Sequence, residues 1–329
     1  MPANLPPDYY AAERRYREAT SIQEKVDILR EMLAIMPKHK GTEHLQGDLK
    51  RKIAKLNSQA QKKQATTRSS GLDHIPREGA GQVVLVGPPN SGKSSILSGL
   101  TNAHTEVADY PFSTFKPVQG MMPFEDIQVQ LVDLPPVSPE YRESWMYNII
   151  RLADLVLLVI DLSAQRPKEQ VLKTADILEA HKIRLQRKGE GRPQGSVATK
   201  STILVGNKAD VFGASEKGEE LLVAYGDDFP CLFISIKNQS NIGELQKILF
   251  QGLRVIRVYT KTPGKKSDLT KPYVLSSGTT VMDAARTIHK ELAESIKYAR
   301  LWGSDKYDGQ RVERDHILED GDIIEIHTR

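Results

Sequence analysis

The chain has 329 residues, a length that accommodates two or three domains with a sizeable hydrophobic core. Hydrophobic residues make up 39% and charged residues 27%, which is typical of a soluble globular protein and excludes wholesale disorder. The longest wholly aliphatic run, residues 155–160, is far shorter than the roughly 18 residues that a membrane span needs. Residues 1–7 lack the basic and apolar regions of a secretory signal, and the single cysteine, Cys231, excludes an internal disulfide. We therefore expect a cytoplasmic protein without a membrane partner.

The 46 basic and 42 acidic residues give a net charge of +4, but the basic excess is concentrated in three segments. Residues 38–68 contain nine Lys or Arg and two acidic residues, whereas residues 181–200 and 254–273 each contain six Lys or Arg and one acidic residue. The rest of the chain is therefore acidic. Such basic segments are typical of a surface that binds a polyanion, although lysine-rich helix faces are also often simply solvated.

Residues 20–57 are predicted to form two helices separated by a break at Pro37. Apolar residues recur at helical spacing in two stripes, which are Ile22, Val26, Leu29, Leu33 and Met36, then Leu45, Leu49, Ile53 and Leu56. Basic residues occupy most of the other face of the second stripe, so a helical hairpin with a basic outer surface is expected. Residues 58–80 are rich in Gln, Ser, Thr and Gly, as is typical of a linker.

From residue 82 the pattern changes to short apolar runs, the later ones separated by helical stretches. These runs are residues 82–86, 155–160, 202–205 and 231–234. They predict an α/β fold with a mostly parallel sheet that helices cover on both faces. Residues 128–132 alternate between polar and apolar, as in a strand near the sheet edge. After about residue 253, short strands around one predicted helix at 281–296 indicate a further, smaller domain.

Residues 87–94 match the pattern G-x-x-x-x-G-K-[ST] between an apolar strand and a helix that begins near Ser94. The backbone amides of such a loop, together with the helix N-terminus, can cradle phosphates. Lys93 would reach the β- and γ-phosphates, and the Ser94 hydroxyl would ligate Mg²⁺. The nucleotide-binding residues expected here are Gly87, Pro88, Pro89, Asn90, Ser91, Gly92, Lys93, Ser94 and Ser95.

The motif N-K-x-D at residues 207–210 follows another predicted strand and suits the recognition of guanine. The Asp210 carboxylate can accept hydrogen bonds from N1–H and the 2-amino group of guanine, a donor pair that adenine lacks, so the motif selects GTP over ATP. Asn207 would brace the loop, and the stem of Lys208 would lie over the base. A companion loop that supports the base through backbone amides is expected at Ser235, Ile236 and Lys237.

Two further positions are predicted to serve the metal ion. Asp133 ends the strand at 128–132, where a carboxylate would hold a Mg²⁺-bound water. Thr114 occupies a first switch segment and is the favoured Mg²⁺ ligand, with Ser113 as the alternate. Loop capping is the other explanation for both positions.

With these motifs in this order, the chain resembles the Obg superfamily of GTPases, and within it the developmentally regulated GTP-binding proteins. Residues 38–45 and 52–56 resemble the N-terminal helical hairpin of that family, and residues 259–261, 297–299, 301–303, 315–316 and 318–320 resemble its C-terminal TGS domain. The resemblance implies a Ras-like P-loop G domain at residues 78–253, preceded by a hairpin and linker at 1–77 and followed by a ubiquitin-like β-grasp TGS domain at 254–329. Such TGS domains are associated with RNA and ribosome contact.

The chain departs from the family pattern in two places. The family commonly carries an inserted domain after a segment like residues 182–185, which a short basic loop at 186–200 replaces here, so the function of that domain is not inherited. The second switch reads Asp-Leu-Pro-Pro at 133–136 where the family has D-x-P-G. Pro136 lacks the backbone N–H that the glycine would donate to the γ-phosphate, so weak discrimination between GTP and GDP is expected.

Hydrolysis should be slow, because Val137 stands where Ras-like proteins place a water-orienting glutamine. Asn90 matches the position that helps to hold K⁺ in related potassium-activated GTPases, although an ordinary turn role is the alternative. The expected function is Mg²⁺-dependent GTP binding and hydrolysis, acting on rRNA or the ribosome, with no DNA sequence recognition evident and with a protein regulator as a further partner. The alternative is a GTP-dependent assembly scaffold with weak or no hydrolysis; an ATPase is disfavoured by the intact N-K-x-D motif.

Overall fold

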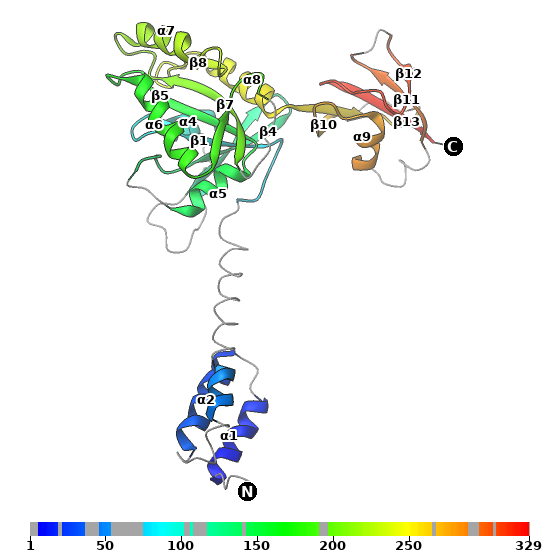
Figure 1. The fold of residues 1–329 in the computed structure, drawn as a ribbon. Helices are drawn as coiled ribbons and strands as arrows, with labels where there is room; N and C mark the ends of the chain where they lie inside the picture. The colour runs from blue at the N-terminus through cyan, green and yellow to red at the C-terminus, as the bar shows by residue number, and fades with distance from the viewer. Residues whose placement is uncertain are drawn as a thin grey trace. The chain divides into compact units, whose positions relative to one another are not determined.

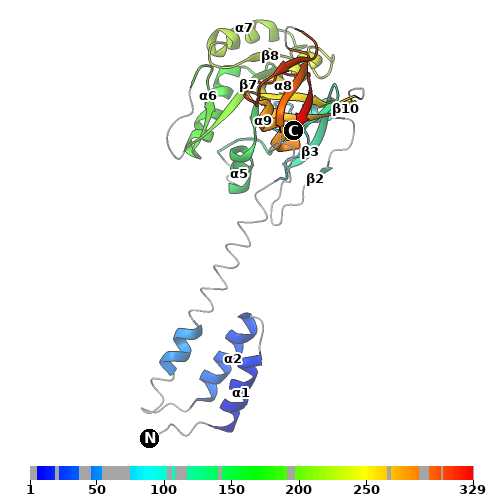
Figure 2. The same cartoon turned by 90° about the vertical axis from the view of Figure 1, so that its right-hand side faces the viewer.

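In the computed structural model the chain divides into two compact units, residues 1–73 and 74–329. The described residues are 6–18, 22–36, 46–53, 75–101, 106–107, 117–139, 143–190, 197–264, 268–288, 296–304 and 307–328. Figures 1 and 2 show the elements of both units. In these described parts, no helix is both long and apolar enough to cross a membrane.

The first unit is helical and contains one helix more than the sequence pattern predicts. Helix α1 (Pro7–Glu18) precedes α2 (Ile22–Ile35), and residues 46–53 are also helical. Leu29 and Met32 of α2 pack with Leu49 and with Tyr9 and Ala12 of α1. Because α1 buries tyrosine and alanine rather than an aliphatic stripe, hydrophobic periodicity missed it. Residues 37–45 and 54–74, including most of the first basic segment, lie outside the described residues.

The second unit begins with an eight-stranded sheet that confirms the predicted α/β class. Its strands are β1 (Gln82–Val86), β2 (Glu106–Val107), β3 (Val118–Phe124), β4 (Ile127–Asp133), β5 (Leu155–Asp161), β6 (Ile183–Gln186), β7 (Ala198–Asn207) and β8 (Cys231–Phe233). The order is β2-β3-β4-β1-β5-β7-β6, with β8 also paired to β7. Among the strand pairs that the described residues form in this sheet, only β2–β3 and β3–β4 are antiparallel. The carboxyl ends of the parallel strands therefore share one edge, where ligand-binding loops gather.

Helices cover both faces of this sheet, as expected for parallel strands that are apolar throughout. Helices α4 (Lys93–Leu100) and α8 (Ile242–Leu253) pack on the face that Val83 and Leu85 present. Helices α5 (Ser144–Leu152), α6 (Pro167–Ala180) and α7 (Ala214–Tyr225) pack on the opposite face, with Val84 and Val86. Successive β1 residues thus enter two separate cores.

The prediction that residues 128–132 lie near the sheet edge needs correction. Strand β4 lies between β3 and β1, and Gln130 is 1% exposed. The Gln130 side chain is buried because it is fully used in hydrogen bonds: its Oε1 accepts from Gln82 Nε2 (2.9 Å), and its Nε2 donates to Gln119 Oε1 (3.0 Å) and to the Pro76 carbonyl (3.0 Å). Polar alternation here therefore reflects a buried amide network that also ties residues 75–80, expected as part of a linker, to the sheet.

A second, five-stranded sheet forms a C-terminal module, residues 255–328. Its elements are β9 (Val255–Thr260), β10 (Asp268–Ser276), α9 (Val281–Ile288), β11 (Ile296–Trp302), β12 (Gln310–Val312) and β13 (Asp322–Thr328), with strand order β10-β9-β13-β11-β12. Val281 and Ala284 of α9 pack against one face of the sheet. The predicted helix at 281–296 is too long, because Ile296 already belongs to β11, where its side chain is buried.

Candidate functional site

The loop between β1 and α4 has the backbone geometry that the G-x-x-x-x-G-K-[ST] pattern predicts. A Cβ at Gly87 would lie 2.2 Å from the Val159 carbonyl oxygen, and a Cβ at Gly92, whose φ is +90°, would lie 2.1 Å from Asn207 Nδ2. Both positions therefore require glycine. Gly92 is the N-cap of α4, and no side chain caps it, so the first amides of this helix face the loop without a side-chain acceptor.

Lys93 is held inside this loop. Its Nζ donates to the carbonyl oxygens of Gly87 (3.2 Å) and Pro88 (3.1 Å), and the residue is 7% exposed. Burial lowers the pKa of Lys93, although the nearby Asp133 carboxylate opposes this shift. The ammonium group rests on neutral carbonyls, an arrangement that phosphate oxygens would improve upon.

Asp133 and Ser94, predicted to serve the metal ion, lie next to each other. Ser94 Oγ donates to Asp133 Oδ2 at 2.5 Å, while Asp133 Oδ1 is buried and accepts no hydrogen bond in the structure. Burial raises the pKa of Asp133, and the hydrogen bond from Ser94 and the charge of Lys93 only partly offset the rise. A hydroxyl beside an unsatisfied carboxylate oxygen is an oxygen-only donor set that fits Mg²⁺. Thr114 and Ser113 lie outside the described residues.

The predicted base-recognition motif, residues 207–210, contacts both the phosphate loop and the predicted companion loop. Asn207 Nδ2 donates to the Ser91 carbonyl (3.0 Å), which braces the phosphate loop against the end of β7. Ser235 Oγ donates to Asp210 Oδ1 at 2.6 Å, and this hydrogen bond lowers the pKa of Asp210. Lys237 Nζ lies 4.0 Å from Asp210 Oδ2. An ionised Asp210 is therefore kept as an acceptor at this end of the site.

A cavity of about 680 Å³ connects several of these residues. It is lined by Pro89, Asn90, Gly92, Lys93, Ser94, Ser95, Val118, Asp133, Leu134, Pro135, Pro136 and Lys208. Ser91 is fully buried behind the loop, where its Oγ donates to the Pro88 carbonyl at 3.0 Å. Asp210, Ser235, Ile236 and Lys237 are not part of this lining, but Lys208 links their loop to it.

The second switch segment is anchored at its start. The Val137 backbone N–H donates to the Gly87 carbonyl at 3.0 Å, and the Val137 side chain is 3% exposed within the core. Pro136 has no N–H, and that of Val137 is already used, so neither residue offers a donor toward the cavity. The side chain of Val137 points into the core and is therefore not placed to orient a water molecule.

Sequence patterns did not single out Asp161, which only marked the end of an aliphatic run. In the structure it ends β5, and its Oδ2 accepts from Lys208 Nζ at 2.6 Å. The two residues are 47 positions apart, so no local motif could have joined them. Their strands are neighbours in the sheet, which alone reveals the pair.

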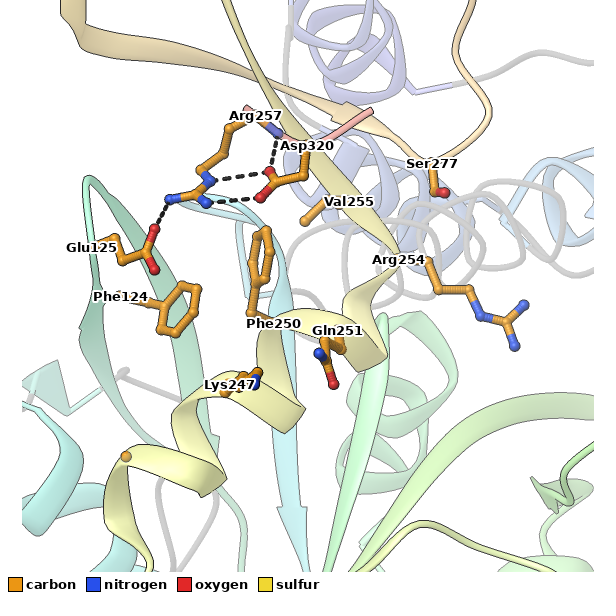
Figure 3. Close-up of a pocket in the computed structure, with 11 residues that line it drawn as sticks. Phe124, Glu125, Lys247, Phe250, Gln251, Arg254, Val255, Arg257, Ser277 and Asp320 are labelled. Atoms are coloured by element: carbon orange, nitrogen blue, oxygen red, sulfur yellow. Dashed lines mark hydrogen bonds and ion pairs between the residues drawn. The ribbon is translucent and has the colours of Figure 1, made fainter. Parts of the chain in front are cut away.

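A second cavity, of about 610 Å³, lies where α8 meets the C-terminal module, and its lining includes Arg257, Glu125 and Asp320 (Figure 3). Arg257 donates to Asp320 (2.7 Å), Asp126 (2.9 Å) and Glu125, and its side chain is 11% exposed. Hydrogen bonding to Asp320, with Glu125 and Asp126 contributing, raises the pKa of Arg257. Each of the charged groups just named has a partner within the protein. The cluster therefore has the character of a structural contact.

Basic residues of the second and third basic segments, residues 181–200 and 254–273, also form ion pairs within the protein. Lys261 pairs with Glu325 (3.1 Å) and lies over the Trp302 ring at 3.9 Å. In residues 181–200, Arg184 pairs with Glu179 at 3.0 Å and Arg187 with Asp228 at 3.5 Å. A net charge counted along the sequence therefore overstates the positive charge that these segments offer to a ligand.

Known proteins match the chain in both of its larger parts. Residues 82–200 match the family model described as 50S ribosome-binding GTPase, and residues 256–328 match the TGS domain. An uncharacterized GTP-binding protein of Methanocaldococcus jannaschii is 28% identical and covers 94% of this chain and 93% of its own. Human developmentally-regulated GTP-binding protein 2 is 28% identical and covers 93% of this chain and 99% of its own. The solved structure of a GTP binding protein from Pyrococcus horikoshii shares the fold, with 16% identity, a TM-score of 0.50 and coverage of 75% of this chain and 100% of that one.

The sheet, the phosphate loop and the C-terminal module together define a P-loop GTP-binding protein that carries a TGS domain. Its relatives match along nearly the whole chain and not only in the nucleotide motifs. Along nearly its whole length the chain is similar to developmentally regulated GTP-binding proteins, the family that its sequence motifs resemble.

Proposed function

We propose that this protein binds Mg²⁺ and GTP at the cavity beside the phosphate loop and hydrolyses GTP slowly. The observation that carries the proposal is the meeting of Lys93, Ser94 and Asp133 at the N-terminus of α4, with Asp133 Oδ1 buried and without a partner. Mg²⁺, when bound, would neutralise phosphate charge and polarise the γ-phosphoryl group. We propose domain limits of 1–77, 78–253 and 254–329, and a cytoplasmic location.

The residues of the site have separate tasks in this proposal. The loop amides and Lys93 would hold the phosphates, and Ser94 with Thr114 would ligate the metal ion, whereas Asp133 would hold one of its waters. Asp210 would accept from the guanine edge while Ser235 keeps its carboxylate in place. Slow turnover follows from Val137, because a buried apolar side chain cannot orient the attacking water.

Nucleotide binding is tested by titration calorimetry with GDP, GTP and ADP in the presence and absence of Mg²⁺. GDP and GTP should bind and ADP should not, and Asp210→Asn should lower guanine nucleotide affinity by about a hundredfold or more, as expected for losing a charge-assisted hydrogen-bond pair. Ser235→Ala, which removes only the support of Asp210, should have a smaller effect. Equal affinity for ADP and GDP would reject guanine selection.

Potassium stimulation is a finer part of the proposal and rests on Asn90. This residue lines the cavity with a left-handed backbone (φ +63°), a conformation that asparagine tolerates in ordinary turns as well. Turnover of GTP should be faster in K⁺ than in Na⁺, and Asn90→Ala should remove the difference. Identical rates in the two salts, or stimulation that survives Asn90→Ala, would leave Asn90 as a turn residue.

We also propose that the protein docks on rRNA or the ribosome through its basic N-terminal helices and its TGS domain. The matched family description, 50S ribosome-binding GTPase, supports this direction. Lys50, Arg51 and Lys52 are exposed on one helix, as are Arg300 and Arg311 on neighbouring strands of the TGS sheet. Because Arg257 and Lys261 are paired within the protein, we assign the contact to these exposed residues instead.

Sedimentation with ribosomes, with and without a non-hydrolysable GTP analogue, tests this docking. Binding should fall steeply with salt and weaken when Lys50, Arg51 and Lys52 are replaced by Ala. Flat binding between low and high salt would reject an RNA footprint. It would instead favour the alternative, a GTP-dependent protein scaffold with little hydrolysis, which the anchored Val137 and the missing N–H of Pro136 also support.

A further inference from the structure

One buried carboxylate beside the nucleotide site has no part in the function proposed above. Asp161 ends β5, is 8% exposed, and is the register partner of Asn207 in the parallel β5–β7 pair. Lys208, the first residue after β7, therefore emerges beside Asp161. Its Nζ donates to Asp161 Oδ2 at 2.6 Å.

The Asp161 carboxylate is fixed by contacts on both oxygens. Oδ1 accepts from the backbone N–H (2.8 Å) and the Oγ (2.6 Å) of Ser163, which leaves Oδ2 aimed at Lys208. The backbone N–H of Asp161 donates to Gln170 Oε1 at 3.0 Å, which holds the strand end as well. Burial alone would raise the pKa of Asp161, but hydrogen bonds from Lys208 and Ser163 outweigh it and lower that pKa, so the group is an anion.

Lys208 is the residue that would benefit from such a rigid anchor. It lines the same cavity as Lys93 and Ser94, and its backbone is left-handed, with a φ of +66°. A non-glycine residue in that conformation is strained and needs surrounding contacts to hold it. The backbone N–H donates to Asn207 Oδ1 (2.8 Å), and Asp161 holds the other end of the side chain. Together these contacts direct the four-carbon stem of Lys208 along the cavity wall.

The structure assigns to Asp161 the role of a positioning residue for guanine nucleotide binding, acting through Lys208. By fixing the ammonium group, Asp161 prearranges the lysine stem as a surface for the base and ribose, so that the nucleotide does not bear the entropic cost of ordering a long side chain. This inference rests on the proposed function, because it requires that guanine nucleotides bind in this cavity.

The substitution Asp161→Asn tests the contact between Asp161 and Lys208 by itself. The asparagine Oδ1 can still accept from Ser163, but its amide nitrogen cannot accept from the Lys208 ammonium. Simple electrostatics and positioning then predict opposite signs: removing a negative charge near a polyanion should tighten binding, whereas loss of the anchor should weaken it. We expect the affinities for GDP and GTP each to fall by about tenfold, because the two nucleotides share the base and ribose that Lys208 would contact. A fluorescent GDP analogue should also dissociate faster.

A double-mutant cycle with Lys208→Met distinguishes positioning from a merely structural role, since methionine keeps an unbranched stem without the charge. Asp161→Asn should have little further effect in the Lys208→Met background, while the ligand-free variants keep the wild-type melting temperature within a few degrees. Ser163→Ala, which leaves the Lys208 contact in place, should bind GDP almost as the wild type does.

Three outcomes would overturn the inference: unchanged or tighter GDP binding by Asp161→Asn, effects of the two substitutions that simply add, or an equal loss in Ser163→Ala. If the wild-type protein binds no guanine nucleotide, the proposed function itself fails. If it binds and Asp161→Asn does not differ, only the role of Asp161 is rejected.

Discussion

Two charged clusters of the second unit use the same kinds of side chain in opposite ways. At the phosphate loop, burial lowers the pKa of Lys93 and raises that of Asp133, so both shifts oppose the charged forms. In the Arg257 cluster, where the C-terminal module meets Glu125 and Asp126, hydrogen bonding raises the pKa of Arg257. Hydrogen bonds from Tyr259 and Arg257 outweigh burial and lower the pKa of Asp126. The first cluster is short of compensating charge, whereas the second supplies its own.

This difference separates a binding site from a structural contact. Buried charges without full partners cost folding free energy, and a ligand of the right charge recovers that cost on binding. Mg²⁺ and phosphates would do so at Lys93 and Asp133. The Arg257 cluster has no such deficit, since carboxylates from both sides of the contact surround one guanidinium group (Figure 3). Experiments on the two clusters should therefore move different quantities.

The largest effect is expected from Lys93→Ala. Loss of the ammonium group should lower GDP and GTP affinity by about a hundredfold or more, because it removes a buried charge-assisted contact with the phosphates. Titration calorimetry measures the loss. Lys247→Ala, at a lysine that lines the second cavity, is the matched control and should bind nucleotide as the wild type does. Comparable losses in both variants would erase the distinction between the clusters.

Arg257→Gln should instead affect stability. It leaves three carboxylates close together without their cation, and the free energy of unfolding should fall by about 2 kcal/mol, less than for a fully enclosed pair because Asp320 and Glu125 are partly exposed. Arg254→Gln, at an exposed arginine on the same cavity, should change it by less than about 0.5 kcal/mol. Denaturant unfolding measures both, and nucleotide affinity should not change in either variant.

Pro136→Gly should increase the preference for GTP over GDP by about fivefold, the scale of one added hydrogen bond. Glycine restores a backbone N–H beside the phosphate loop, where Val137 has already donated its own to Gly87. The affinity ratio, measured with a non-hydrolysable GTP analogue, tests this. Equal ratios in variant and wild type would mean that the second switch does not sense the γ-phosphate through this position.

The smallest expected effect concerns how stability depends on pH. Two substitutions are expected to change the melting temperature in opposite directions. The raised pKa of Asp133 means that its stabilising contribution to the ligand-free protein is present below the usual aspartate pKa and is lost as the pH rises through the folded-state value. Asp133→Asn should therefore raise the melting temperature at pH 7 by a few degrees while abolishing Mg²⁺-dependent tightening of nucleotide binding.

Asp126→Asn is the matched comparison with the opposite sign. The pKa of Asp126 is lowered, so its contribution is present at neutral pH and is lost as the pH falls through the folded-state value. This substitution should lower the melting temperature at pH 7, and its effect should shrink as the pH falls below the usual aspartate pKa. If both substitutions shift the melting temperature in the same direction at pH 7, the contrast between an uncompensated and a self-neutralised cluster is wrong.

How much of the site the sequence predicted depends on how far apart the interacting residues lie along the chain. Gly87 to Ser94 are consecutive, so their backbone conformation and the helix start that follows are local properties, and the α/β pattern placed Asp133 and Asp210 at strand ends. By contrast, Asp161 and Lys208 are 47 residues apart, and their contact depends on the order β1-β5-β7 in the sheet. Helix α1 was missed because it buries tyrosine and alanine rather than an aliphatic stripe, and the helix predicted at 281–296 was too long because Ile296 belongs to β11.

The sequence by itself determined the fold class, the phosphate loop and the guanine motif, because each rests on neighbouring residues and on strand patterns that burial imposes locally. Only the tertiary structure decided how charge is distributed. Arg257 and Lys261 count as basic residues in the chain, yet carboxylates up to 132 positions away neutralise Arg257, and Gln130 looks surface-exposed until β1 and β3 pair with its strand. Electrostatic compensation and burial are properties of what surrounds a side chain in space, and the linear order of residues does not contain that information.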